Sequence, residues 1–165
     1  MILISAMTED RIIGAGDGMP WDVPEEYQQY LDFTRGQTII LGRRSMEIFG
    51  PDLTAAHAVV LSRSDSVDRP DGYEGDLTTA AGLDEAVAAA EAYGKTVFCG
   101  GGANVYAQCL PLADAMYLST IKPHAVDRDL PGDAHFPEFD PADWRVAEER
   151  DHPDFHFVHY ERPGV

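Results

Sequence analysis

Short runs of β-branched and aromatic residues alternate with helical stretches along most of this 165-residue chain, and this alternation restricts the possible folds more than any other feature. Helices placed in this way typically cross over between parallel strands of one sheet, so we expect an α/β fold. A chain of this length supports one sizeable core, which predicts a single domain over residues 1–165. The β-rich runs occupy residues 2–6, 38–41, 58–61, 96–99, 116–121, 144–149 and 155–161. The helical stretches occupy residues 24–34, 45–49, 83–93 and 103–108.

The end of the chain follows a different pattern. Its last two β-rich runs are separated only by residues 151–154, which is too short for a crossover helix and long enough for a turn. These two runs are expected to form an antiparallel hairpin, which makes the sheet a mixed one. The polar stretch at residues 62–79 predicts a long connection with a short strand near Tyr73.

The chain is strongly acidic, with a formal net charge of −17 from 12 basic and 29 acidic residues. Such a charge repels phosphates, which argues against nucleic acids and anionic membranes as partners. Lys95 and Lys122 are the only lysines, so arginine supplies the other ten basic residues. Ordinary acidic solubility and adaptation to concentrated salt both fit this composition. We expect the second, because molar salt screens the self-repulsion of such a surface.

The sequence carries no pattern of a membrane segment, a leader peptide or a metal site. No run of about 18 apolar residues occurs, and the start MILISAM does not resemble a signal peptide, so we expect a cytoplasmic protein. We also expect a monomer. Cys99 and Cys109 form no CxxC motif and are expected to be buried thiols. His156 and His159 fall on opposite faces of the predicted strand, which argues against a shared metal ion.

Two adjacent glutamates follow a glycine-rich loop in the stretch GDGMPWDVPEEY at residues 16–27. Asp22 with Glu25 three residues later fits a capping box at the start of the helix. At 100° per residue, Glu26 borders the apolar stripe of this helix, whereas Glu25 lies on the far side. An inward carboxyl has a raised pKa and holds a proton near neutral pH, so Glu26 is a candidate acid. A solvated glutamate that favours the helix dipole is the alternative.

Three loops that follow β-rich runs carry residues suited to an anionic ligand. The stretch TIILGRRSMEIFG places two arginines and a serine at the start of a helix, where free N–H groups and guanidinium groups converge. The next run ends in LSRS, and a later one ends in a glycine triplet whose backbone is able to approach a pyrophosphate. Each feature alone is typical of a surface charge or a turn. Together they predict a dinucleotide with an extra phosphate, and the absence of GxGxxG argues against a standard Rossmann site.

Several stretches taken together resemble the dihydrofolate reductase family over nearly the whole chain. They are DRIIGAGDGMPWDVPEE, TIILGRRSMEIFG, VVLSRS, GGGANVYAQCLP, MYLSTI and GDAHFPEFDPADW. The resemblance implies a mixed eight-stranded sheet with flanking helices. It also implies an oxidoreductase of one-carbon metabolism that reduces 7,8-dihydrofolate to 5,6,7,8-tetrahydrofolate with NADPH.

The resemblance also implies roles for individual residues. It matches Glu26 to the carboxylate that binds the amino group and a ring nitrogen of the pterin, and Trp21 to the indole that helps hold a water beside it. Residues 14–19 match a mobile loop that closes over the ring. The implied substrate-binding residues are Ile4, Ser5, Tyr27, Tyr30, Phe49 and Ser119. The implied cofactor-binding residues are Ala6, Ile13, Gly14, Met19, Gly42, Arg43, Arg44, Ser45, Leu61, Ser62, Arg63, Gly101, Gly102 and Tyr106.

The chain departs from the family pattern at two positions. Ala56 stands where an arginine usually clamps the glutamate carboxylate of folate, and Gly100 stands where a bulky aliphatic residue is usual. These departures affect the expected substrate more than the expected fold.

Two other functions are compatible with these features. One is a different NADPH-dependent reductase of the same superfamily, such as the ribosylaminopyrimidine reductase of riboflavin synthesis; the loop at residues 19–21 and Glu26 argue against it. The other is a nucleotide-binding module without catalysis. Consumption of NADPH in the presence of dihydrofolate separates these possibilities.

Overall fold

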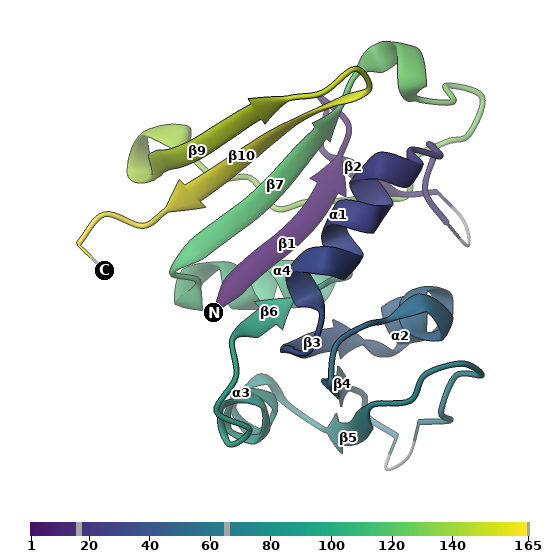
Figure 1. Ribbon diagram of the computed structural model, residues 1–165, viewed down its shortest axis with the longest axis vertical. Helices are drawn as coiled ribbons and strands as arrows, with labels where there is room; N and C mark the ends of the chain where they lie inside the picture. Colours follow the sequence, from purple (N-terminus) through teal and green to yellow (C-terminus); the bar gives the residue numbers. More distant parts are fainter. Residues whose placement is uncertain (16–17, 65–66, 165) are drawn as a thin grey trace.

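The computed structural model describes residues 1–15, 18–64 and 67–164, and its centre is an eight-stranded sheet with the order β5-β4-β3-β6-β1-β7-β10-β9 (Figure 1). Neighbouring strands from β5 to β7 run parallel, whereas β10 is antiparallel to both β7 and β9. The predicted mixed sheet and C-terminal hairpin are therefore confirmed. The strands of this sheet are β1 (Ile2–Met7), β3 (Thr38–Gly42), β4 (His57–Leu61), β5 (Asp76–Ala80), β6 (Val97–Cys99), β7 (Ala115–Ile121), β9 (Arg145–Asp151) and β10 (Phe155–Glu161).

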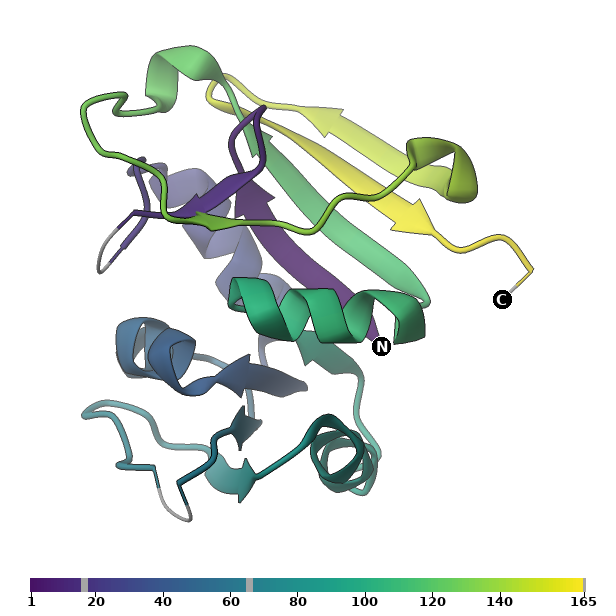
Figure 2. The same cartoon turned by 180° about the vertical axis from the view of Figure 1, so that it is seen from behind.

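Helices cover both faces of the sheet, because successive residues of its buried strands point to opposite sides. The described helices are α1 (Pro24–Thr34), α2 (Arg43–Phe49), α3 (Leu83–Glu91) and α4 (Ala103–Cys109), with single 3-10 turns at η1 (Gly50–Asp52), η2 (Leu110–Leu112), η3 (Pro123–Ala125) and η4 (Pro141–Asp143). Ile39 and Leu41 of β3 belong to the cluster that includes Met46 of α2, whereas Ile40 belongs to the cluster that includes Ala86 of α3. Figures 1 and 2 show α1 and α4 on opposite faces of the sheet.

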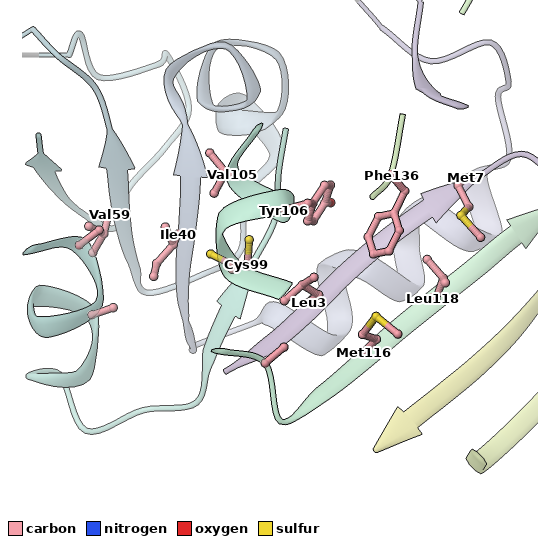
Figure 3. Packing of buried hydrophobic residues seen from close by; sticks show 14 of the residues in the cluster. Leu3, Met7, Ile40, Val59, Cys99, Val105, Tyr106, Met116, Leu118 and Phe136 are labelled. Carbon is pink, nitrogen blue, oxygen red and sulfur yellow. The ribbon is translucent and has the colours of Figure 1, made fainter. Parts of the chain in front are cut away.

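The packing of α4 fixes the loop that precedes it. Figure 3 shows Tyr106 of α4 and Phe136 lying close to β1, between Leu3 and Met7, and their ring centroids are 5.1 Å apart. The Tyr106 hydroxyl donates a hydrogen bond to the carbonyl oxygen of Ile4 at 2.7 Å. Because this hydrogen bond anchors α4 to β1, the glycine loop between β6 and α4 has a defined position at the end of β6.

The predicted elements recur with small changes in their bounds. Helix α1 and strand β10 begin and end at the predicted residues. The short strand expected near Tyr73 is instead β5, which begins at Asp76. Tyr73 is buried, and its hydroxyl donates to the carbonyl oxygens of Ala55 at 3.1 Å and Asp76 at 3.2 Å. The aromatic residue is therefore an anchor for the loop before the strand.

The capping box predicted for α1 is wrong. The N-cap residue is Val23, and no side chain caps the helix. A β-bridge between Trp21 and Val126 holds the chain that precedes the helix. The helix begins at Pro24, whereas an N-cap at Asp22 requires a helix that begins at Val23. The Glu25 carboxylate instead lies 2.9 Å from Nδ1 of His152.

A small second sheet was not predicted from the sequence. It pairs β2 (Ile12–Gly14) with β8 (Ala134–His135), which are too short to show a β pattern and lie far apart in the chain. Arg11, with a φ of 66°, supports this sheet because its guanidinium group bonds the Phe136 carbonyl oxygen and the Glu138 carboxylate.

The two cysteines are buried free thiols, as the sequence predicts. They lie in the cluster on the α3–α4 face of the sheet. Among the described residues, no helix combines the length and the apolar character that a membrane span requires.

Candidate active-site cleft

A cleft of about 810 Å³ opens at the edge of the sheet where β3, β4, β5 and β6 end. Ligands of open parallel sheets bind at this edge, because the loops that leave the carboxyl ends of the strands meet there. The order of the strands also reverses here, with β1 and β3 on either side of β6. The loops contribute Gly42, Ser62, Ala81 and Gly100 to the wall of the cleft.

A backbone hydrogen bond joins the end of β3 to the loop after β6, and this loop requires glycine at residue 101. The Gly42 N–H donates to the Gly101 carbonyl oxygen at 2.7 Å. Gly101 has a φ of 100°, and a Cβ there would lie 2.8 Å from the Tyr106 ring, so a side chain does not fit. A Cβ at Gly102 would meet Ser45 Oγ at 3.5 Å and nothing closer, so this backbone is open toward the cleft.

Three guanidinium groups line one end of the cleft. Arg43 and Arg44 are the first residues of α2, and Arg63 follows β4. Arg43 Nε lies 3.2 Å from Glu47 Oε1, in an exposed pair that holds the arginine only weakly. In a chain with a net charge of −17, this cluster of guanidinium groups in the cleft lining suits phosphate groups.

Glu26 is buried in the wall at the other end of the cleft, with 7% of its surface exposed. Burial raises the pKa of its carboxyl from 4.5 to about 7, while a hydrogen bond with Ser119 acts in the opposite direction. The amide of Gln29 donates to the Ser119 hydroxyl at 3.3 Å. Glu26 therefore faces inward, as the helix pattern predicts, and exchanges its proton near neutral pH.

Aromatic side chains form the wall beside Glu26. Tyr27, Tyr30 and Phe49 lie with their ring centroids 6.1 to 6.4 Å apart. The Tyr27 hydroxyl donates to Asp52 Oδ2 at 2.8 Å, which joins α1 to η1. A flat ring held against these residues would be close to the Glu26 carboxyl.

A second cavity of about 400 Å³ adjoins this end of the cleft. It shares Met19, Glu26, Tyr27, Ile48 and Phe49 with the cleft and is also lined by Trp21. Glu26 therefore borders both spaces.

Most of the residues singled out in the sequence come together around the cleft. All of the implied substrate and cofactor residues line it except Ser119 and Gly101. Ser119 lies behind Glu26 on β7, and Gly101 forms the turn against Tyr106. Of the glycine-rich loop, Gly14, Gly18 and Met19 line the cleft, whereas residues 16–17 lie outside the described residues.

Several lining residues were not predicted. Gln29, one turn after Glu25 on α1, was also missed; it lies outside the lining and donates to the Ser119 hydroxyl. Asp133 and Ala134 come from the segment that pairs with β2, and no local pattern marks such a long-range approach. The helix periodicity would have identified Ile48 and Val105 as inward-facing. The remaining lining residues that were missed are Ala81, Gly82, Ala103, Asn104 and Gln108.

The structure shows what occupies the space beside Gly100. A Cβ at this position would lie 2.7 Å from Ile39 Cδ1 and 2.6 Å from Leu41 Cδ2. Neighbouring strand residues therefore fill the room that a bulky residue 100 would need. Ala56 is half-buried before β4, and its N–H donates to the Gln37 carbonyl oxygen at 2.8 Å.

Comparisons with known proteins agree on one family. The family model for dihydrofolate reductase matches residues 1–162. Dihydrofolate reductase HdrB of Haloferax volcanii is 34% identical over 98% of this chain and 82% of its own length. Dihydrofolate reductase type 3 of Salmonella typhimurium is 32% identical over 92% of this chain and 86% of its own length. The Enterococcus faecalis dihydrofolate reductase complexed with NADP(H) has a similar fold, with a TM-score of 0.77, 24% identity, and coverage of 98% of this chain and 95% of its own.

The burial of Glu26 makes the free energy of unfolding depend on pH. Its pKa is about 7 in the folded chain and near 4.5 when unfolded, so the folded state binds more protons between these pH values and stability falls as pH rises through them. We expect Glu26→Gln to abolish this fall, which amounts to roughly 3 kcal/mol. Denaturant unfolding at a series of pH values measures the effect.

Glu91→Gln is the control, because Glu91 is an exposed glutamate on α3. This variant is expected to keep the pH dependence of the unmodified protein. If Glu26→Gln also keeps this pH dependence, the raised pKa of Glu26 is not its cause.

Proposed function

Because the chain belongs to the dihydrofolate reductase family, we propose that Glu26, the aromatic wall beside it and the arginine end of the cleft form its active site. The enzyme reduces 7,8-dihydrofolate to 5,6,7,8-tetrahydrofolate with NADPH. The observation that carries the assignment of the site is a buried carboxyl with a pKa of about 7 in a cleft whose other end is lined by arginines. The family match does not favour the ribosylaminopyrimidine reductase alternative.

The arginine end of the cleft fits NADPH. The open backbone at Gly102 suits a pyrophosphate, because amide groups are able to approach it without a side chain between them. We assign the ribose phosphate to Arg43 and Arg63, since guanidinium groups bind phosphate bidentately. When bound, NADPH supplies the hydride. The residues assigned to its nicotinamide end are Ala6, Ile13 and Tyr106, with Arg44, Ser45 and Ser62 near its phosphates.

The other end of the cleft is assigned to the pterin. The Glu26 carboxylate accepts hydrogen bonds from the amino group and a ring nitrogen of the pterin and so orients the ring. Tyr27, Tyr30 and Phe49 hold the flat ring by contact and exclude water. Because Glu26 also borders the cavity lined by Trp21, we assign to Trp21 the positioning of the water through which a proton reaches the reacting ring nitrogen.

The decisive assay follows the loss of reduced nicotinamide absorbance with dihydrofolate as substrate. Glu26→Gln is expected to lower turnover near neutral pH by about 10² or more, because it removes a group that polarises the ring and exchanges protons. Glu25→Gln is the matched control, since Glu25 is exposed and lies next to Glu26 on the helix. Equal losses in both variants would contradict the role of Glu26, and no turnover by the unmodified protein would contradict the function.

Recognition of the extra phosphate is expected to depend on Arg63. We expect Arg63→Ala to raise the KM for NADPH about tenfold or more and to leave the KM for NADH nearly unchanged, because NADH lacks that phosphate. Steady-state kinetics with each cofactor measure this difference. Lys95→Ala removes a positive charge outside the cleft lining and controls for a general charge effect. An equal loss with both cofactors would show that Arg63 does not read the phosphate.

We also propose that the enzyme is salt-adapted, cytoplasmic and monomeric. The net charge of −17 with two lysines supports salt adaptation. Large exposed apolar side chains among the described residues are Leu112 on η2, Leu130 in the segment before β8 and Val146 on β9, and their separation along the chain supports a monomer.

Salt adaptation predicts a melting temperature that rises from dilute buffer into molar KCl. The cause is repulsion between acidic side chains, which salt screens over a Debye length of about 3 Å at 1 M. Thermal unfolding at increasing KCl measures it, with sucrose at matched water activity as the control for a solvent effect. A flat melting temperature in KCl would contradict salt adaptation.

A further inference from the structure

Basic side chains line only one end of the cleft. Among the described residues that line it, the lysines and arginines are Arg43, Arg44 and Arg63, all of which come from the start of α2 and the loop after β4. The opposite end is lined by the acid Glu26 and by aromatic rings. A ligand with anionic groups at both ends therefore finds cations for one end only.

A carboxylate lies just beyond the aromatic end. The Tyr27 hydroxyl donates to Asp52 Oδ2 at 2.8 Å, and Asp52 is exposed on η1. Because Tyr27 lines the cleft, a substrate chain that leaves the aromatic wall on this side passes close to the negative charge of Asp52. Two carboxylates that approach one another repel, and added salt weakens the repulsion.

The basic groups nearest in the sequence to Tyr27 and Asp52 outside the cleft lining are Arg35 and His57, and each lies beside a carboxylate. Arg35, directly after α1, lies with its guanidinium 3.2 Å from Asp32 Oδ1, which also accepts a hydrogen bond from Gln28 at 2.9 Å. His57, at the start of β4, lies 3.2 Å from Asp76 and stacks on Tyr93. Neither side chain lines the cleft, so the described lining at this end presents no cation to an incoming carboxylate.

Resting on the proposed function, we propose that the site recognises the pterin and the adjoining benzoyl ring but not the glutamate carboxylates of its substrate, and that Asp52 disfavours them. The substrate class is then a dihydropterin whose anionic tail makes no favourable contribution to binding. Affinity comes from Glu26 and the aromatic wall, and each further glutamate lowers it.

The test compares three substrates with NADPH at low and molar KCl: dihydropteroate, dihydrofolate and the dihydrofolate triglutamate. We expect KM for dihydropteroate and dihydrofolate to agree within about fivefold, because no charged hydrogen bond to the tail is made. The KM for the triglutamate should exceed that for dihydrofolate by about threefold at low KCl, and the difference should vanish in molar KCl.

Asp52→Asn keeps an acceptor for Tyr27 and removes the charge. It is expected to lower the KM for the triglutamate about threefold and to leave that for dihydropteroate unchanged. Glu91→Gln makes the same change of net charge on α3 and should alter neither the KM for the triglutamate nor that for dihydropteroate. Arg35→Ala should also leave the preference between substrates unchanged.

Two results would overturn the inference. One is a preference of about tenfold or more for dihydrofolate over dihydropteroate, which requires a cation that grips the tail. The other is an effect of Asp52→Asn no larger than that of Glu91→Gln. If the unmodified protein reduces none of the substrates, the proposed function itself fails and the inference falls with it.

Discussion

The burial of the Glu26 carboxyl is the constraint on which the arrangement of this site depends. A charged group inside a protein costs several kcal/mol unless it is paired, hydrogen-bonded or neutralised. The chain reduces this cost through Ser119 and by raising the pKa of the carboxyl to about 7, so the group is neutral part of the time. Because Ser119 belongs to β7 and Glu26 to α1, the site requires one register between this helix and the sheet. The apolar contacts of Phe33 with Tyr117 and Phe157 maintain that register.

The topology of the sheet separates the two kinds of chemistry in the cleft. Strands β3, β4 and β6 end at one edge, so their loops bring arginines and glycine backbone together without long side chains having to cross the protein. Helix α1 lies on the face over β1 and brings the carboxyl and the aromatic rings to the other end. Ile4 and Ala6 of β1 also line the cleft, so the central strand of the sheet forms part of its wall.

Local patterns predicted the elements that carry the site, because the helix period and the strand period are properties of neighbouring residues. The inward position of Glu26 followed from 100° per residue alone, and the arginine and glycine loops followed from their places after buried strands. The mistakes arose where distant segments meet. The bridge of Trp21 to Val126 displaces the cap expected at Asp22, and the pairing of β2 with β8 brings Asp133 into the cleft. Such contacts leave no periodic trace in the sequence.

The acidic surface influences which contacts in the cleft are able to select the substrate. In dilute buffer a net charge of −17 opposes the approach of an anionic cofactor and substrate, whereas molar salt screens charges beyond about 3 Å and removes long-range attraction as well. Contacts at exposed rims, such as an arginine with a carboxylate, then lose most of their value. Buried contacts are screened much less; Glu26 is buried, and its aromatic neighbours are half-buried. In molar salt, a reductase with this surface therefore gains more binding specificity from buried contacts to the pterin ring than from exposed contacts to a charged tail at the mouth of the cleft.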